Sequence, residues 1–538
     1  MAVSDTHAAI DASAAQLPGA LAAADYLPIL PVVICFLAGA VMLILRKRTA
    51  WHGWIAIPAL CLLTLTDLLL LRRVAGEGPQ TMMMGGWRAP FGIAFTADLA
   101  GTLFATVGAM VALACGLFAL VSISAEERRY GFFPFLFLMM GGVSGAFLTG
   151  DIFNLYVWFE VLLIGSFGLL ILGSRHQQLD GAIKYCFLNL VGTTLFLIAT
   201  GYLYGWFGTL NMADIARKAA DQPAGGGLYT IAALYLVAFG MKAAGFPLNA
   251  WLPASYHTPR FVVSALFAGL LTKVGVYALI RVLLMLLAPQ QQDLAFILAW
   301  VAGLTMMVGA LGALAQTDLR RLLNYVVISG IGTIFVGIAA PGALGAGGDG
   351  AVGLSGALFY ALHSIVVMTG LYLAAGVATD RAGSSSLHDM GGLWRGHVGF
   401  AAMMLVLLFA VSGLPPFSGF WPKLMLVRAS FAAGMPWLGA AVLASGFLVT
   451  IASARVFALA FWRSKPEHEA MVVEPARYEH LDGPKPRGAD AMLPILGLVC
   501  LVLAAGLWPQ WLAGLTRTAA AGILDPGAYL HSVFGAAP

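Results

Sequence analysis

Ionisable side chains in four apolar stretches are of the types that proton exchange requires. Three of the eight lysines lie in such stretches: Lys242 in AFGMKAAGFPLNAWLP, Lys273 in SALFAGLLTKVGVYALI and Lys423 in GLPPFSGFWPKLMLV. Glu160 lies in a fourth stretch, FNLYVWFEVLLIGSFG. Burial disfavours the charged form of both residue types, whereas an ion pair favours it. Such groups can therefore exchange protons when a partner moves or changes charge.

Each of these charges is costly inside a membrane protein. A charge at the bilayer centre costs about 2.5–3.5 kcal/mol on insertion scales, so buried ionisable groups are by default functional. The structural alternative is that Glu160 and Lys242 form a static ion pair and that the other lysines extend to the interface. Lys273 lies eleven residues into its apolar stretch, which makes such an extension difficult.

The elements that must position these side chains are apolar helices. Of the 538 residues, 60% are hydrophobic and 10% are charged, and the mean hydropathy is +0.88. A soluble chain carries about 25% charged residues, so the composition excludes a soluble globule. The small formal net charge of +4 gives no support for nucleic-acid binding. We therefore expect an all-α polytopic membrane protein.

About fourteen apolar stretches are long enough to be transmembrane helices, since a bilayer core requires about 20 helical residues. They are 28–46, 54–71, 99–122, 131–149, 152–173, 182–206, 228–248, 262–287, 293–314, 322–341, 352–377, 399–430, 436–463 and 490–510. The twelfth stretch is too long for one straight crossing. We expect it to contain a break.

Basic residues between these stretches predict the direction of the helices. With the N-terminus outside, most of the lysines and arginines fall in cytoplasmic loops. The outer loops keep fewer, chiefly Arg72, Arg73, Arg88, Arg217, Lys218 and Arg281. The positive-inside rule then favours both termini outside, in a bacterial inner membrane. The first residues lack the pattern of a secretory signal, so we expect no cleavage, and the five scattered cysteines give no disulfide or metal pattern.

Prolines next to two of the buried lysines predict broken helices. The expected helix breaks involve Pro247, Pro415, Pro416 and Pro422. Proline removes a backbone N–H and frees a carbonyl, and irregular backbone at membrane depth is tolerated only beside protein or a water-filled cavity. Two breaks in corresponding places point to an ion site between inverted repeats, whereas one alone would fit an ordinary kink.

The placement of the breaks predicts two inverted repeats of five helices, with Lys242 and Lys423 as counterparts. The expected units are an N-terminal extension with three helices, two five-helix bundles, and a cytoplasmic loop with the last helix and tail: 1–130, 131–287, 293–463 and 464–538. We also expect a short surface helix within 208–227, a polar loop at 464–490 and an exposed tail from Trp511.

His363, in ALFYALHSIVVMTG, is a candidate proton relay between Lys273 and Lys423. Neutral histidine both accepts and donates near pH 7. A hydrogen bond between helices explains a single membrane histidine equally well. His257, in PASYHTPR, lies near a helix end, where we expect a loop or an entrance. Other polar residues inside apolar stretches are Asp67, Asp98, Thr193, Thr194, Ser329 and Asn249.

No zinc, nucleotide-binding or CxxC motif occurs in the sequence. We therefore expect no cofactor and no metal. The energy for ion movement must then come from an ion gradient or from a partner.

Four motifs around these residues resemble those of the antiporter-like subunits shared by Mrp-type multisubunit cation/proton antiporters and respiratory complex I. The motifs are FNLYVWFEVL, KAAGFPLNAWLPASYHTP, VSALFAGLLTKVGVYALIR and GLPPFSGFWPK. The resemblance runs from Phe132 to Lys423 and is highly specific. The chain departs from the family at Met368, where many relatives have a lysine nearby, and at Arg260, where proline is common.

The resemblance implies a role for each buried residue. Glu160 and Lys242 would form the charge pair that controls proton affinity, Lys273 would be the central relay, and Lys423 would be the terminal proton-exchanging group. Because Met368 cannot carry a proton, the relay near it would rest on His363 and water. The implied fold has fourteen helices with two inverted five-helix bundles.

The lysine at position 423 and the phrase SALFAGLLTKVGVYAL are most similar to the D-type members of Mrp complexes. This implies a proton-translocating subunit of a Na⁺ or K⁺/H⁺ antiporter, not an enzyme, assembled with other Mrp subunits in membrane lipid. An alternative is a proton-pumping subunit of complex I or of a membrane-bound hydrogenase. A third is a scaffold protein with inert ion pairs.

Overall fold

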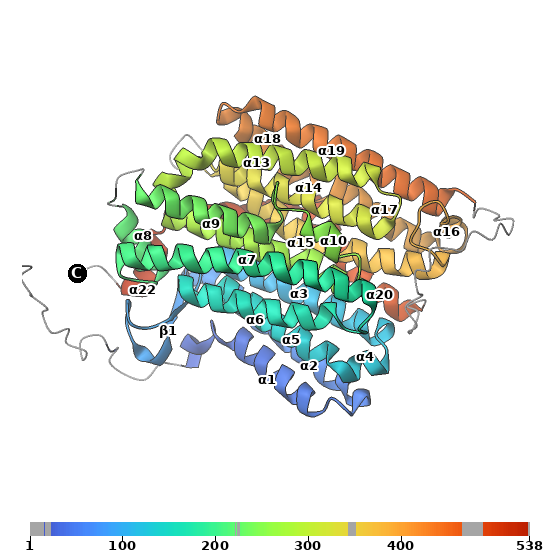
Figure 1. The fold of residues 1–538 in the computed structure, drawn as a ribbon, viewed down its shortest axis with the longest axis horizontal. Coiled ribbons are helices and arrows are strands. Elements are labelled where there is room, and N and C mark those ends of the chain that lie inside the picture. Colours follow the sequence, from blue (N-terminus) through green and yellow to red (C-terminus); the bar gives the residue numbers. More distant parts are fainter. Residues whose placement is uncertain are drawn as a thin grey trace, which may run out of the picture.

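The structure, a computed structural model, describes residues 16, 23–220, 222, 226–342, 351–464 and 488–535. Most of these residues lie in helices, and the long helices run lengthwise beside one another (Figure 1). Ten of the described helices are long and apolar enough to cross a membrane, and four shorter apolar helices accompany them. The prediction of a mainly helical polytopic membrane protein is therefore confirmed. The number of crossings and the inverted repeats stay predictions.

The N-terminal part of the chain contains helices and a small sheet. The helices are α1 (Leu30–Ile44), α2 (His52–Glu77), α3 (Leu99–Ser122), α4 (Ala125–Tyr130), α5 (Phe132–Leu148), α6 (Ile152–Leu170) and α7 (His176–Phe207). Short turns of 3-10 helix are η1 (Ala23–Tyr26), η2 (Thr49–Trp51) and η3 (Met84–Gly86). Strands β1 (Gln80–Met83) and β2 (Ala94–Ala97) pair antiparallel between α2 and α3, with Gln80 opposite Ala97.

The middle of the chain begins with a short helix, which confirms the one predicted within 208–227. Its helices are α8 (Met212–Ala220), α9 (Gly227–Ala243), α10 (Trp251–Ser255), α11 (Phe261–Leu266), α12 (Thr272–Ile280), α13 (Ala288–Ala315), α14 (Leu319–Ala339) and α15 (Val352–Ala382). A π-helical turn, η4 (Phe267–Leu271), joins α11 to α12, and a second, η5 (Arg281–Leu286), extends α12. These four segments form one continuous span.

The C-terminal part adds a second group of helices. They are α16 (Leu393–Gly396), α17 (Val398–Ser412), α18 (Phe420–Ala432), α19 (Pro436–Phe457) with the π-helical turn η6 (Ala458–Trp462), α20 (Ala489–Leu507), α21 (Pro509–Leu524) and α22 (Gly527–Phe534). Figure 1 shows α8, α22 and β1 at one end of the molecule, and α4 and α16 at the other.

Helix α15 lies at the centre of the bundle. Every residue from Gly353 to Ala378 is buried, and α3, α11, α14, α17, α18, α20 and α21 all pack against it. A helix that is apolar on all sides is typical of one enclosed by other helices. The span formed by α11, η4, α12 and η5 is equally enclosed. These two innermost spans carry His363 and Lys273.

Two helices are interrupted, as predicted. Pro247 lies between α9 and α10, and Pro415 and Pro416 lie between α17 and α18. Gly413 ends α17 with φ +85°, in the left-handed region that favours glycine. Pro422, which we expected to interrupt the helix, lies in the first turn of α18, where a missing N–H needs no partner. It therefore begins a helix instead of breaking one.

The C-terminal segment is not an exposed tail, so the prediction from Trp511 onward is wrong. Leu512, Ala519 and Ile523 of α21 are buried, and α21 packs against α3 and α15. Their spacing places them on one face of the helix, and the low overall hydropathy of the segment obscured this pattern. The predicted loop at 464–490 lies almost entirely outside the described residues.

Helices α13 and α14 pack closely because of two glycines. A Cβ on Gly309 would lie 2.3 Å from the backbone nitrogen of Ser329, and a Cβ on Gly332 would lie 2.5 Å from that of Met306. Small residues allow membrane helices to approach at backbone distance. Neither position leaves room for a side chain.

We expect Gly332→Ala to destabilise the folded chain, because the added methyl group must push the α13 backbone away. Overpacking of this kind costs about 1–3 kcal/mol. Gly201→Ala in α7 is the matched control, since a Cβ there meets nothing within 4 Å. Thermal unfolding of the two purified variants measures the effect. Equal transition temperatures would contradict the packing role of Gly332.

Candidate functional site

Lys242 lies in the last turn of α9, next to the first helix break. Its side chain is buried, and its Nζ donates a hydrogen bond to the carbonyl oxygen of Asn189 in α7 at 3.1 Å. The ring of Phe159 lies 5.4 Å from the same nitrogen. The indole of Trp251 donates to the carbonyl of Met241 at 2.9 Å, so α10 holds the broken end of α9. The partial negative charge at a helix C-terminus favours a cation there.

Glu160 lies in α6, directly after Phe159. Its Oε1 is buried and accepts no hydrogen bond from the described residues. Lys242 is within electrostatic reach of the carboxylate. None of the ion pairs between described residues joins the two side chains, so the static ion pair of the structural alternative is not formed in this conformation.

Lys273 is completely buried in the first turn of α12, which follows the π-helical turn η4. Its Nζ donates to the carbonyl oxygen of Ala268, within that turn, at 2.6 Å. π-helical turns are rare and frequently mark functional sites, because they disturb the regular backbone ladder. The ammonium group therefore finds its partner in its own helix and does not extend to an interface.

Gly275 brings the helices of Lys242 and Lys273 together. A Cβ on Gly275 would lie 3.0 Å from the Cβ of Lys242 and 2.9 Å from the backbone nitrogen of Ala243. Helices α9 and α12 thus touch at Lys242 on one side and at Gly275, two residues after Lys273, on the other. A larger residue at position 275 would separate them.

His363 lies in α15 and faces the second helix break. Its Nδ1 forms a 2.8 Å hydrogen bond with Oγ of Ser418, which lies between α17 and α18. Its Nε2 is buried and has no hydrogen-bond partner among the described residues. Both Lys273 and Lys423 are within electrostatic reach of the imidazole. With the proton on Nδ1, the lone pair of Nε2 is free to accept a proton.

Lys423 lies in the first turn of α18, beyond the second break. Its Nζ donates to the carbonyl oxygen of Ser412 at 2.7 Å and so caps the end of α17. Two glycines leave space for the ammonium group: a Cβ would lie 2.9 Å from Nζ at Gly413 and 3.4 Å from it at Gly446 in α19. The break and its glycines therefore form the pocket of this lysine.

The two lysines lie on opposite sides of their breaks. Lys242 ends the helix before the first break, whereas Lys423 begins the helix after the second. The two lysines therefore correspond in lying next to a helix break, as predicted, but they do not occupy equivalent positions along their helices. The five candidate residues come from α6, α9, α12, α15 and α18.

Two buried ion pairs were not predicted. Asp98, the N-cap of α3, pairs with Arg281 in η5, and Glu127 in α4 pairs with Arg260 at 2.7 Å. Arg281 is 2% exposed, so the prediction that it lies in an outer loop is wrong. The pair joins Asp98 and Arg281, which are far apart in the sequence. Arg281 follows Lys273 by eight residues, and this spacing places the side chains of Lys273 and Arg281 on one face of the span.

Met368 lies in the centre of α15 and is buried. The departure from the family pattern therefore falls on the helix that also carries His363.

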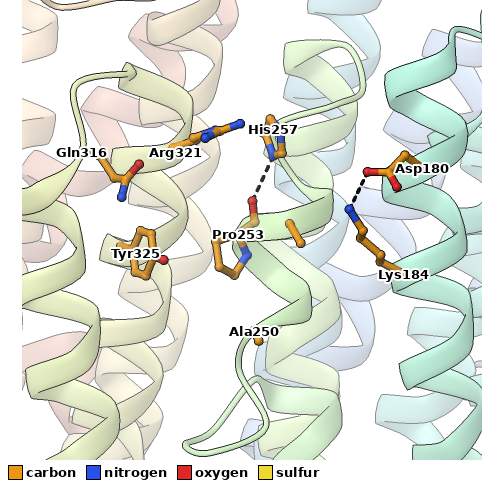
Figure 2. A pocket seen from close by; sticks show the side chains of 9 residues that line it. Asp180, Lys184, Ala250, Pro253, His257, Gln316, Arg321 and Tyr325 are labelled. Atoms are coloured by element: carbon orange, nitrogen blue, oxygen red, sulfur yellow. Dashed lines mark hydrogen bonds and ion pairs between the residues drawn. The ribbon is translucent and has the colours of Figure 1, made fainter.

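A cavity of about 380 Å³ opens beside the first helix break. Figure 2 shows the residues that line it; His257 is hydrogen-bonded to the carbonyl of Pro253, and Lys184 is paired with Asp180. Arg321, from the start of α14, lines the opposite wall. The cavity lies between α7, α10 and α14, at the end where cytoplasmic loops are predicted.

Fold and site together define a polytopic membrane protein that holds buried and half-buried ionisable side chains among its helices, two of whose spans are broken. Residues 149–448 match the family model described as NADH:quinone oxidoreductase/Mrp antiporter, transmembrane. The chain belongs to this family, which confirms the resemblance read from the four motifs. The matched residues include all five candidate proton-transfer residues.

Relatives of known name match almost the whole chain. The D-type subunit of the Na⁺/H⁺ antiporter of Alkalihalophilus pseudofirmus is 36% identical, over 94% of this chain and 99% of the relative. Its namesake from Bacillus subtilis is 34% identical, over 94% and 98%. The chain is thus similar over its length to single subunits of multisubunit antiporters.

Solved structures show the same fold. A chain of the Mrp complex from Dietzia sp. superposes with a TM-score of 0.85 at 27% identity, over 96% of this chain and all of that one. A chain of respiratory complex I from Thermus thermophilus with bound NADH gives 0.77 at 25% identity, over 93% and all of that chain. The fold is therefore that of the antiporter-like subunits.

We expect Asp98→Asn to destabilise the chain strongly, because it leaves the Arg281 guanidinium buried without a counter-charge. Removal of one partner of a buried ion pair costs about 3–5 kcal/mol. The double variant Asp98→Leu with Arg281→Met removes both charges and should recover much of the loss. Thermal unfolding and yield in membranes measure both. A single variant as stable as the wild type would show that the pair contributes little.

Proposed function

We propose that the chain is the proton-translocating subunit of a multisubunit Na⁺ or K⁺/H⁺ antiporter. The observation that carries this proposal is a set of ionisable side chains inside the helical bundle: Lys242, Lys273 and His363 are buried, and Glu160 and Lys423 are half-buried. Full-length relatives named as D-type subunits of Na⁺/H⁺ antiporters support it. The chain is a transporter subunit and not an enzyme, and ion gradients drive its transport.

Protons enter from the cytoplasmic side through the cavity beside α10. His257 and the Asp180–Lys184 pair line this cavity, which borders the helix break that follows Lys242. Glu160, when ionised, favours the protonated form of Lys242, and its protonation or displacement removes that stabilisation. Glu160 and Lys242 thus act as a charge pair without direct contact, and the charge of one sets the proton affinity of the other.

Transfer along the row depends on repulsion between neighbouring cations. A proton on Lys242 disfavours a second ammonium on Lys273, which lies in the helix that packs against α9 at Gly275, since like charges in a poorly screened interior repel strongly. Lys273 then releases its proton toward Nε2 of His363, whose free lone pair can accept it. Water completes the path near Met368, because that side chain carries no proton.

Lys423 is the terminal group that exchanges protons with the outer side. Its ammonium group is held by the carbonyl of Ser412, at the end of α17. A change in the angle between α17 and α18 would break this hydrogen bond and favour release of the proton. The break at Pro415 and Pro416 allows such a movement, since no continuous backbone ladder joins the two helices.

The chain works as one subunit of a larger complex in the membrane. The homologous subunits belong to multisubunit Mrp assemblies, so other antiporter subunits are its partners. We place the complex in the bacterial inner membrane, in contact with lipid and with both termini of this chain outside. The exchanged ions are H⁺ and either Na⁺ or K⁺.

The alternative is a proton-pumping subunit of complex I or of a membrane-bound hydrogenase. The similarity to a chain of complex I supports it, but at lower identity and TM-score than the similarity to the Mrp chain. Purification of the intact complex distinguishes the two. Small membrane partners favour the antiporter, whereas iron–sulfur or quinone-binding partners favour the alternative.

We expect Lys242→Ala, Glu160→Ala and Lys273→Ala each to abolish cation/proton exchange in membrane vesicles while the complex still assembles. Lys→Arg should rescue poorly at positions 242 and 273, because arginine scarcely releases its proton. Lys47→Ala is the matched control, since Lys47 is exposed. Proton uptake after addition of Na⁺ or K⁺ measures exchange. Normal exchange in the three variants would refute the assigned roles.

We expect His363→Ala to slow exchange only in part, because water can take over the proton path. Ser418→Ala removes the hydrogen-bond partner of Nδ1 and should alter the pH dependence of exchange with a smaller effect on the maximal rate. The readout is the exchange rate as a function of pH in the same vesicles. A wild-type rate and pH profile for His363→Ala would show that the histidine has a structural role.

A further inference from the structure

Asp67 in α2 is a buried carboxyl group outside the row of proton-transfer residues. The side chain is 1% exposed, and neither Oδ1 nor Oδ2 has a hydrogen-bond partner among the described residues. Asp98 and Glu127, two other buried acids, each pair with an arginine. Asp67 is therefore the exception among these three carboxylates.

The helices around α2 offer Asp67 no counter-charge. α1 and α3 pack against α2, and their sequences contain no lysine, arginine, histidine, aspartate or glutamate within the helix bounds. The titratable side chains that they carry are Cys35 in α1 and Cys115 in α3, and Cys35 is within electrostatic reach of Asp67. An ionised carboxylate without a partner in such a place is strongly unfavourable. The group must bind a proton or another small cation.

A stripe of buried oxygen atoms on α3 leads from the N-terminus of that helix to the backbone of Asp67. The hydroxyl of Thr102 donates to the carbonyl of Asp98 at 2.8 Å, and the hydroxyl of Thr106 donates to the carbonyl of Thr102 at 2.7 Å. The Thr106 hydroxyl also lies 3.2 Å from the carbonyl oxygen of Asp67. Carbonyl and hydroxyl oxygens thus continue from the N-terminus of α3 to the backbone of the residue that carries the carboxyl group.

We propose that Asp67 is a second ion-exchange site of the subunit, whose ligand is a proton or a small monovalent cation. In this conformation the carboxyl group holds a proton. On exchange, the O–H bond breaks, the proton leaves along the α3 stripe, and a cation or a new proton binds the carboxylate. This inference rests on the proposed function, because it adds a site to the same transport cycle.

Exchange measurements on the intact complex test the role of Asp67 in transport. We expect Asp67→Asn, which mimics the permanently protonated group, to slow Na⁺- or K⁺-dependent proton exchange about tenfold, equal to about 1.4 kcal/mol in the barrier. Asp67→Glu, which keeps the titratable group, should retain most of the rate. Asp293→Asn removes an exposed acid in α13 and is the matched control. All variants are compared at equal complex content.

Chemical labelling tests the protonation state independently of transport. Dicyclohexylcarbodiimide reacts with protonated carboxyl groups in apolar surroundings, and Leu62, Leu65 and Leu69 on α2 are exposed at the outer surface where such a reagent arrives. We expect Asp67 to be modified at neutral pH, as located by mass spectrometry of the peptide. Protection by Na⁺ or K⁺ would identify a cation as the competing ligand, and unchanged labelling would identify the proton alone.

The outcomes separate this inference from the proposed function. If Glu160→Ala abolishes exchange while Asp67→Asn keeps the wild-type rate and pH profile, Asp67 is a static protonated residue and the inference is overturned. If neither variant changes exchange, the proposed function fails with it. Loss of complex in Asp67→Asn but normal exchange in Asp67→Leu would likewise overturn the inference, since a residue without a titratable group would then suffice.

Discussion

The interaction on which the site depends is a hydrogen bond from a lysine inside the helical bundle to a backbone carbonyl. Lys242 donates to Asn189, Lys273 to Ala268 and Lys423 to Ser412. A carbonyl is a dipole and carries no net charge, so a lysine that loses its proton leaves no unpaired counter-ion behind. The buried arginines instead pair with carboxylates. The fold thus separates cations that can change protonation from cations that remain fixed.

Irregular backbone supplies two of these carbonyls. Ala268 lies in a π-helical turn, and Ser412 lies at the end of a helix that stops before a proline pair. In hydrocarbon, such exposed carbonyls would be costly, and inside the bundle they become ligands for ammonium groups. The free carbonyl at an irregular turn and the ammonium group of the lysine therefore satisfy each other, which explains why lysines and helix breaks occur together in the sequence.

Much of the architecture followed from the sequence because apolar length and proline position act locally. The helices, both breaks and the short helix of residues 212–220 were predicted in this way. The contacts were not predictable, since they join distant segments: Asp98 with Arg281, or His363 with Ser418. The charge of Arg281 suggests an exposed loop, and the low overall hydropathy of α21 suggests a tail, although both pack inside the bundle. Sequence patterns identify ionisable residues, but only packing decides which of them are paired.

The docking of α21 and α22 has a consequence for how the protein is made. α21 packs against α3 and α15, and Ser532 of α22 is hydrogen-bonded to Thr81 in β1. The segments that line the centre of the molecule are therefore enclosed only after the last part of the chain has left the ribosome. During insertion, the faces of α3 and α15 that α21 covers remain without their final neighbour, and shortened translation products would lack this cover.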